Sequence, residues 1–319
     1  MTADGAGSPR TPAMTRHTVR VMAPSRRVVH LAFNDVKPSA LEAATRVRAL
    51  IERHAEFAGH IDVHYECDTE AIAKSDLICV VGGDGTLLAA ARRLLGTGVP
   101  ILGVNAGRVG FMAAFDPDAF EARAADLLEH APLPLRTVRA LSATVSDGDG
   151  GATPLEAINE MVITAGPPFR MISLEIAING EPGPVVNGDG LIVSTPLGST
   201  AYNVSAGGPI VAPDAPVTVI TPIAAHSLAF RPIVLSEDDR VSIRVARGND
   251  DGDIGTTLVA DGQIHKRLHP GAEVVIEGPR RSVDFVMNPE TTYLSTLMKK
   301  LHWAVQPAAQ GRPPQPPER

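Results

Sequence analysis

Hydrophobic residues follow two different patterns along this chain, and the first pattern ends near residue 134. Before that point, short apolar runs typical of buried strands stand between segments whose apolar residues recur at helical spacing. The predicted strands are 27–33, 61–65, 77–81 and 98–104, and the predicted helices are 38–57, 87–95 and 116–128. Strands that alternate with helices predict βαβ units, so we expect an α/β domain with a doubly wound, Rossmann-like parallel sheet.

The second pattern begins at residue 135, where helical periodicity gives way to short β-branched runs. Glycine, proline, aspartate and asparagine separate these runs, as is typical of turns between antiparallel strands. The runs are 141–145, 161–164, 174–178, 191–194, 217–221, 241–245 and 274–276. This pattern predicts an all-β domain, either a sandwich or a distorted prism of strands.

A last helix is predicted over 291–303, and we expect it to return and pack on the first domain because its apolar residues share one side. Both ends of the chain are rich in Gly, Ser, Pro, Arg or Gln, so they are predicted to be disordered. The expected organisation is a leader (1–26), an α/β nucleotide-binding domain (27–134), an all-β domain (135–287), a C-terminal segment (288–305) and a tail (306–319).

The stretch Val80-Val81-Gly82-Gly83-Asp84-Gly85-Thr86 joins a buried strand to a helix start. A glycine turn at a helix N-terminus favours phosphate, because free amides and the helix dipole attract negative charge. Asp84 contradicts simple phosphate binding, since a carboxylate repels phosphate unless it holds a cation or takes a proton. The loop therefore indicates chemistry at a phosphate, although GxxxxGK[ST] is absent. The plainer alternative is a structural turn with Asp84 as the helix N-cap.

A second glycine-rich turn, with Asn105, Gly107 and Gly110, follows the next predicted strand. Ligands of doubly wound sheets bind at the carboxyl ends of the strands, where both glycine turns fall. We therefore expect Asn105 and Arg108 to face the same ligand as Asp84. A purely structural turn is the alternative.

Polar residues also interrupt the β region where apolar residues would pack better. Asn159 and Glu160 together offer a donor and several acceptors, which suits ribose hydroxyls and an adenine amine. The segment 195–202 combines small hydroxyl residues with Tyr202, which suits a sugar and a ring. For Asn159 and Glu160, the alternative is a polar position on an edge strand; for 195–202, it is an ordinary loop. Gln263 is either a residue of a hairpin turn or a side-chain amide that contacts the ligand.

Composition narrows the classes of partner. The net charge of −7 over 319 residues argues against nucleic acid as the main partner, and no apolar run is long enough for a membrane span. Cys67 and Cys79 have neither zinc-site spacing nor a disulfide framework, so we expect a cytoplasmic protein.

Taken together, the motifs resemble those of NAD kinases in order and spacing. They are GGDGT at 82–86, NAGRVGF at 105–111, NE at 159–160, DGLIVSTPLGSTAYNVSAGGP at 189–209, HSLAFRP at 226–232 and DGQ at 261–263. The resemblance implies transfer of a phosphoryl group from ATP or polyphosphate, with Mg²⁺ or another divalent cation, to the 2′-hydroxyl of the adenosine ribose of NAD. It also implies an α/β domain joined to a β domain, and a homodimer or homotetramer in which a neighbouring subunit completes the site.

The resemblance also implies roles for individual residues. Asp84 takes the position of the general base, and the implied phosphate loops contain Gly82, Gly83, Gly85, Thr86, Asn105, Gly107 and Gly110. The implied NAD contacts are Asp84, Gly85, Asn159, Glu160, Arg170, Asn187, Asp189, Thr200, Ala201, Tyr202, Asn203, Val204, Ser205, Ala224 and Gln263, and no residue is assigned as a metal ligand. Two departures stand out, because Leu197 replaces a usual threonine and Ala89 replaces a frequent basic residue.

Two other functions fit parts of the sequence. Diacylglycerol and sphingoid-base kinases share GGDGT, but a lipid kinase needs an apolar acceptor pocket rather than Asn159, Glu160 and Asp189. A non-catalytic dinucleotide-binding regulator is the other alternative, and it has no use for a carboxylate at position 84.

Overall fold

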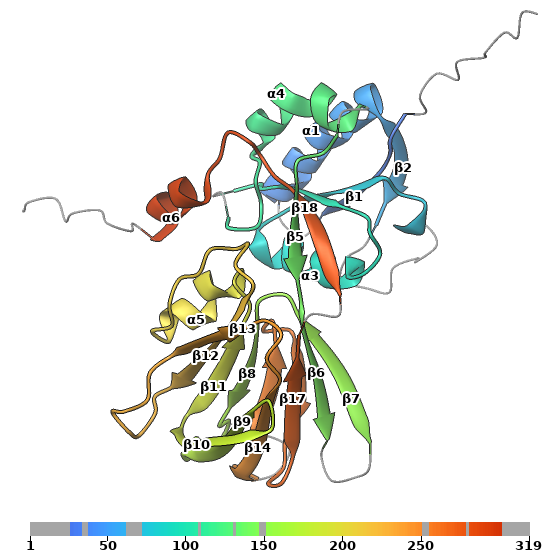
Figure 1. The fold of residues 1–319 in the computed structure, drawn as a ribbon. Coiled ribbons are helices and arrows are strands. Elements are labelled where there is room, and N and C mark those ends of the chain that lie inside the picture. Colours follow the sequence, from blue (N-terminus) through green and yellow to red (C-terminus); the bar gives the residue numbers. More distant parts are fainter. Residues whose placement is uncertain are drawn as a thin grey trace, which may run out of the picture.

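The structure is a computed structural model, and it divides into two layered parts (Figure 1). It describes residues 26–33, 38–61, 72–107, 110–129, 132–146, 151–250, 255–278 and 281–301. Arg108, Trp303 and both chain ends therefore lie outside the described residues. Within the described part, no helix is long and apolar enough to cross a membrane.

The first part is a six-stranded sheet in the order β2-β1-β3-β4-β18-β5. Its strands are β1 (Val28–Phe33), β2 (Glu56–His60), β3 (Leu77–Val81), β4 (Ile101–Val104), β5 (Leu135–Arg139) and β18 (Ser282–Val286), and its helices are α1 (Pro38–His54), α3 (Asp84–Leu94) and α4 (Pro117–Leu128). The four strands β1 to β4 pair in parallel. This arrangement confirms the expected α/β class.

Helices cover both faces of this sheet, as the apolar run of β3 requires. Leu77, Cys79 and Val81 point to one face, where they pack with α1 and α4. Ile78 and Val80 point to the other face and pack with α3. All five side chains are therefore buried, because successive residues of a strand alternate between two covered faces.

The second strand differs from the expected one. We predicted a strand over 61–65, but β2 spans Glu56–His60, and residues 62–71 lie outside the described part. Helix α1 ends at His54, whereas helical spacing suggested an end at residue 57. Phe57 pairs with Val29 in the sheet and packs at the edge of the core. Tertiary packing therefore places Phe57 in a strand rather than in the helix.

Two strands from the range 135–287, which we expected to form the all-β domain, belong to the first sheet instead. Figure 1 shows β5 in green and β18 in orange beside the strands of the first part. They pair with each other in antiparallel fashion, and β18 also pairs with β4. Their apolar residues Val138, Val283 and Phe285 are buried in the cluster around α3, which explains why they join this sheet.

The second part is a sandwich of two antiparallel six-stranded sheets, in the orders β10-β9-β14-β17-β6-β7 and β13-β12-β11-β8-β15-β16. The strands are β6 (Leu141–Ser146), β7 (Ala152–Ala157), β8 (Glu160–Thr164), β9 (Ile172–Ile178), β10 (Glu181–Gly188), β11 (Gly190–Ser194), β12 (Val217–Ile223), β13 (Ile233–Ser236), β14 (Val241–Arg247), β15 (Thr257–Ala260), β16 (Ile264–Arg267) and β17 (Glu273–Glu277). One apolar cluster fills the space between the sheets. The expected all-β sandwich is confirmed.

Three short elements complete the described fold: η1 (Gly198–Thr200), α5 (Tyr202–Ser205) and α6 (Tyr293–Leu301). Helix α6 begins where the chain touches both parts. The Tyr293 hydroxyl donates to the Val211 carbonyl of the second part, and Arg123 on α4 pairs with Glu290. Leu297 is buried, but Leu294 and Met298 stay about half exposed. The C-terminal part of the chain is therefore attached to the first part mainly through strand β18 rather than through α6.

Candidate active site

Asp84 is the first residue of α3, and its side chain bridges the two glycine turns. Its carboxylate accepts hydrogen bonds from the backbone N–H groups of Phe111 (2.9 Å) and Met112 (3.2 Å). Gly83 is the N-cap residue and no side chain caps the helix, so the hypothesis that Asp84 is the N-cap is wrong. The negative charge of Asp84 is therefore compensated by two backbone N–H groups of the second glycine turn.

Gly110 is required for this arrangement. A Cβ atom built on Gly110 would lie 1.7 Å from Oδ1 of Asp84, which no side chain tolerates. Gly107 in the same turn is different, since its nearest neighbour would be Oδ1 of Asn105 at 3.7 Å. Buried Asn105 accepts a hydrogen bond from the Gly107 N–H, so it shapes the turn from inside.

The start of α3 remains open to an anion. Gly83 and Gly85 are exposed, and a Cβ atom at either position would meet nothing within 4 Å. Gly82 faces inward instead, where a Cβ atom would lie 2.7 Å from the side chain of Thr86. Backbone N–H groups in the first turn of a helix lack intrahelical partners, so this end of α3 is suited to phosphate.

Asn159 and Glu160 lie where β7 passes into β8, and both carry unsatisfied acceptors. Oδ1 of Asn159 and Oε2 of Glu160 are buried and make no hydrogen bond. Buried polar atoms are nearly always paired, so two adjacent exceptions indicate a place for a ligand. That ligand must supply hydrogen-bond donors, such as hydroxyl or amine groups.

Asp261, which sequence reasoning treated as a turn residue, holds this pair in place. Its carboxylate accepts from the backbone N–H groups of Ile158 (2.9 Å), Asn159 (2.7 Å) and Glu160 (3.3 Å). The residue is 6% exposed and has a φ of +52°, an uncommon conformation for a non-glycine residue. Three consecutive amides on one carboxylate form an anion-binding nest made by the chain itself.

Arg92 connects Asp261 to the helix that carries Asp84. Its Nε lies 3.6 Å from Oδ2 of Asp261, and its Nη1 donates to the amide oxygen of Gln263 (3.2 Å). Arg92 stands eight residues after Asp84 on α3, which is about 12 Å along the helix axis. Helix α3 therefore links the Asp84 carboxylate of the first part to the Asn159–Glu160 pair of the second part.

The charge of Glu160 depends on this surrounding. Burial, and after it the nearby Asp261 carboxylate, raise the pKa of Glu160 to about 7, although a hydrogen bond from the Tyr202 N–H opposes the rise. Burial also raises the pKa of Asp261, which the three amide donors and Arg92 oppose. Glu160 thus changes its charge near neutral pH, and it accepts hydrogen bonds best above that pH.

The segment 195–205 is held mostly by its own hydrogen bonds. Asn203 is fully buried; its amide donates to the Ser199 and Pro209 carbonyls and accepts from Thr221, so its side chain is fully engaged within the protein. The Thr200 hydroxyl donates to the Leu197 carbonyl. Tyr202 and Ser205 are exposed, whereas Ala201 and Val204 are partly buried.

The two departures from the family pattern line different hollows. Leu197 borders a hollow of about 480 Å³ between β5 and β12, where it packs against the cluster around α3. Ala89 is buried on α3 and borders a second hollow of about 460 Å³ together with Arg92.

Four predicted site residues lie together but far from Asn159. They are Arg170, Asn187, Asp189 and Ala224, and they lie at the end of the sandwich opposite Asn159. The Asn159 carbonyl accepts from Thr195, and the Asp189 carbonyl accepts from Ala165. Residues 159 and 165 are six positions apart, or about 20 Å along a strand at about 3.3 Å per residue.

Exposure and backbone strain mark this second group. Phe169, beside Arg170, is 73% exposed with a φ of +59°, and Ala224 has a φ of +45°. Leu228, in the loop after Ala224, is 90% exposed. Strained backbone and exposed apolar side chains are both concentrated at functional surfaces.

No set of three or more His, Cys, Asp or Glu side chains in the described ranges is arranged to hold a metal ion. Both oxygens of Asp84 already accept backbone N–H groups. The described residues do not by themselves make a metal site.

Comparisons with known proteins identify the family of the chain. Residues 13–131 match the family model of the ATP-NAD kinase N-terminal domain, and residues 158–287 match that of the C-terminal domain. The chain is 34% identical to the NAD kinase of Rhodopirellula baltica, over 87% of each chain. It is 38% identical to the NAD kinase of Geobacter metallireducens, over 81% of this chain and 89% of the relative.

Solved structures have the same fold. Yeast NADH kinase complexed with NADH superposes with a TM-score of 0.76 over 90% of each chain, at 22% identity. An NAD kinase from Archaeoglobus fulgidus in complex with ATP superposes with a TM-score of 0.65 over 82% of this chain and 94% of that chain, at 26% identity. Both halves match NAD kinases, so the lipid kinase hypothesis is not favoured. With two family models and relatives of this identity along most of its length, the chain belongs to the NAD kinase family.

Proposed function

We propose that this protein transfers the terminal phosphoryl group of ATP to the 2′-hydroxyl of the adenosine ribose of NAD, giving NADP and ADP. The observation that carries the proposal is the Asp84 carboxylate at the start of α3, held between two glycine turns. The unpaired acceptors of Asn159 and Glu160 support it, because a dinucleotide supplies hydroxyl and amine donors. ATP as the donor is supported by the ATP complex of the Archaeoglobus fulgidus relative.

In this reaction Asp84 acts as the general base. A ribose hydroxyl is too weak an acid to ionise first, so its proton passes to Asp84 as the new O–P bond forms and the bond to the leaving phosphate breaks. The electron pair of the broken bond leaves with ADP. The amides at the start of α3 lie where negative charge develops, and their fixed dipoles stabilise it.

A divalent cation belongs to the proposal only as a companion of the nucleotide. Mg²⁺ commonly binds through substrate phosphates and few protein ligands, which agrees with the absence of a carboxylate cluster among the described residues. It would supply charge neutralisation on the phosphates, and the proposed roles of Asp84, Asn159 and Glu160 do not depend on its position.

We also propose a homodimer or homotetramer in which a neighbouring copy completes each site. One copy cannot bring Arg170, Asn187, Asp189 and Ala224 to Asn159, because about 20 Å of sheet separates them. A second copy can do so if it docks through this end of the sandwich. The exposed side chains of Phe169 and Leu228 support such docking.

The proposal is tested by measuring NADP formation from NAD with ATP, with other triphosphates and with polyphosphate as donors. Asp84→Asn should lower kcat by a factor of about 10³ or more while NAD affinity changes little, because the variant keeps the shape but cannot take the proton. An Asp84→Asn enzyme with full turnover would contradict the assignment. NAD binding without product from any donor would favour the dinucleotide-binding regulator. A cytoplasmic location is part of the proposal and is supported by the two cysteines without a disulfide pattern.

A further inference from the structure

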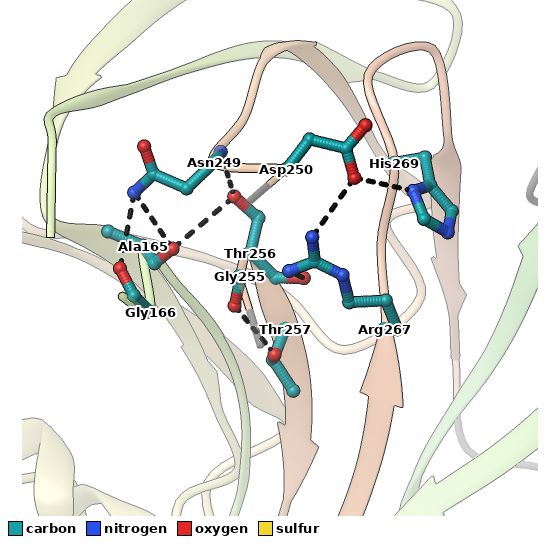
Figure 2. A network of polar contacts seen from close by, with 9 residues as sticks. All are labelled: Ala165, Gly166, Asn249, Asp250, Gly255, Thr256, Thr257, Arg267 and His269. Carbon is teal, nitrogen blue, oxygen red and sulfur yellow. Dashed lines mark hydrogen bonds and ion pairs between the residues drawn. The ribbon is translucent and has the colours of Figure 1, made fainter. Parts of the chain in front are cut away.

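A buried polar network around Asn249, drawn in Figure 2, supports the turn that carries Arg170. Asn249 follows β14 and is only 6% exposed. Its amide nitrogen lies within hydrogen-bond distance of the carbonyls of Ala165 (3.0 Å), Gly166 (3.2 Å) and Arg170 (2.8 Å). One side chain therefore holds both ends of the turn formed by residues 166–170.

Thr256 anchors Asn249 from the other side. The Asn249 N–H donates to the Thr256 hydroxyl (2.7 Å), and the Thr256 N–H donates to the Asn249 carbonyl (3.0 Å). The same hydroxyl reaches the Ala165 carbonyl at 3.4 Å. Figure 2 shows these contacts converging on Ala165 and Gly166, so Asn249 is itself rigidly placed.

The turn lies directly against this network. A Cβ atom on Gly166, which has a φ of +60°, would lie 2.0 Å from the Gly255 carbonyl oxygen. A Cβ atom on Gly255 would in turn lie 2.2 Å from the Asn249 carbonyl oxygen. Two glycines thus bring two backbones into contact, which leaves the turn little freedom to move.

The side chains of the turn at residues 166–170 are mostly exposed. Pro168, Phe169 and Arg170 are all exposed, and Phe169 has a left-handed backbone. A network that only stabilised the core would not need to fix a turn whose side chains point away from it. The Ala165 N–H also donates to the Asp189 carbonyl (2.8 Å), so the network reaches a second residue of the distant group.

We infer that Asn249 is a positioning residue for the NAD site of a neighbouring copy, because it fixes the turn that presents Arg170 and the strand end that presents Asp189. This inference rests on the proposed function and on the proposed second copy. In each oligomer, Asn249 of one chain would then act on the site that contains Asp84 of the other chain.

Mixed oligomers test this directly. Two differently tagged chains are coexpressed and the mixed oligomer is purified through both tags, so that one chain carries Asp84→Asn and the other carries Asn249→Ala. The purely Asn249→Ala oligomer should show a KM for NAD raised about tenfold. In a mixed dimer, one site combines the intact Asp84 of one chain with the intact turn of the other, so about half of the wild-type activity should return with the wild-type KM.

Three comparisons make the outcome specific. Asp84→Asn mixed with Arg170→Ala should also recover wild-type KM, whereas Asp84→Asn mixed with Gly110→Ala should keep a kcat about a hundredfold below the wild type, because both changes act on the Asp84 end of the site. Asn249→Ser keeps one donor and replaces Asn249→Ala if that chain does not fold.

The possible failures are distinguishable. A raised KM in the mixed oligomer with either Asn249 variant would overturn the inference, because Asn249 would then act only within its own chain. If the oligomer of Asp84→Asn and Arg170→Ala chains does not recover the wild-type KM, the proposal that a second copy completes the site is wrong. If the wild type forms no NADP, the proposed function is wrong.

Discussion

The two ends of the second part differ in how they satisfy their polar groups. At the end near α3, Asp261 uses three backbone amides and Arg92 to fix Asn159 and Glu160 within one chain. At the far end, the side chains of Arg170 and Asp189 are exposed, although the backbone beneath them is firmly held. The polar side chains of the near end are thus fixed within one chain, whereas those of the far end face outward, which supports the proposed docking of a second copy there.

Among changes that keep the Asp84 side chain, the largest effect should come from one that moves it. Gly110→Ala places a methyl group where the carboxylate lies, so we expect kcat to fall about a hundredfold, the usual consequence of an ångström-scale displacement of a catalytic group. Gly107→Ala in the same turn meets no atom closer than 3.7 Å and should keep most of the activity. Steady-state kinetics of both variants checks this, and equal activities would show that the second turn does not position Asp84.

Asp261→Asn should weaken the near end in two ways at once. An amide nitrogen would face the N–H groups of residues 158–160, so the free energy of unfolding should fall by about 2 kcal/mol. The misplaced Asn159 and Glu160 should raise the KM for NAD about tenfold. Denaturant unfolding and kinetics measure the two effects, with exposed Asp238→Asn as the control. An unchanged KM together with lost stability would limit Asp261 to a structural role.

Asp189→Ala should separate function from stability at the far end. The side chain is exposed, so the melting temperature should stay within about 1 °C of the wild type, as for most surface substitutions. The KM for NAD should nevertheless rise about tenfold, the usual order for a lost charged hydrogen bond. Thermal unfolding and kinetics on one preparation check this, and a lowered melting temperature with normal KM would reverse the contrast between the two ends.

The smallest expected effect is a gain of stability from Glu160→Gln. Because the pKa of Glu160 is raised to about 7 in the folded state, the favourable protonated form is lost as pH rises through that value. The variant carries no charge at this position, so at pH 8 its free energy of unfolding should exceed that of the wild type by about 1–3 kcal/mol. At pH 5 the two proteins should be nearly equal, while NAD affinity of the variant is lower at pH 8. Denaturant titrations at both pH values decide this, and a gain at pH 5 alone would contradict the sign.

Much of the site could be predicted because its chemistry depends on short stretches of chain. The apolar run from Leu77 to Val81 and the glycines after it predicted a buried strand, a turn and a helix start, and the structure has all three. The β-branched runs after residue 140 predicted a sandwich for the same reason, since strand periodicity is a local property. Asp261 was missed as a positioning group because its three partners lie about a hundred residues away along the chain.

Local pattern by itself thus determined the class of each half, the glycine turns and the carboxylate at position 84. Only the tertiary structure decided that β5 and β18 join the first sheet, and that Asp84 binds the turn at residues 111–112. Only the tertiary structure, too, separated Arg170, Asn187, Asp189 and Ala224 from Asn159. The physical reason is that periodicity and turn chemistry act over a few residues, whereas strand partners and carboxylate partners are chosen by the burial and pairing of distant segments.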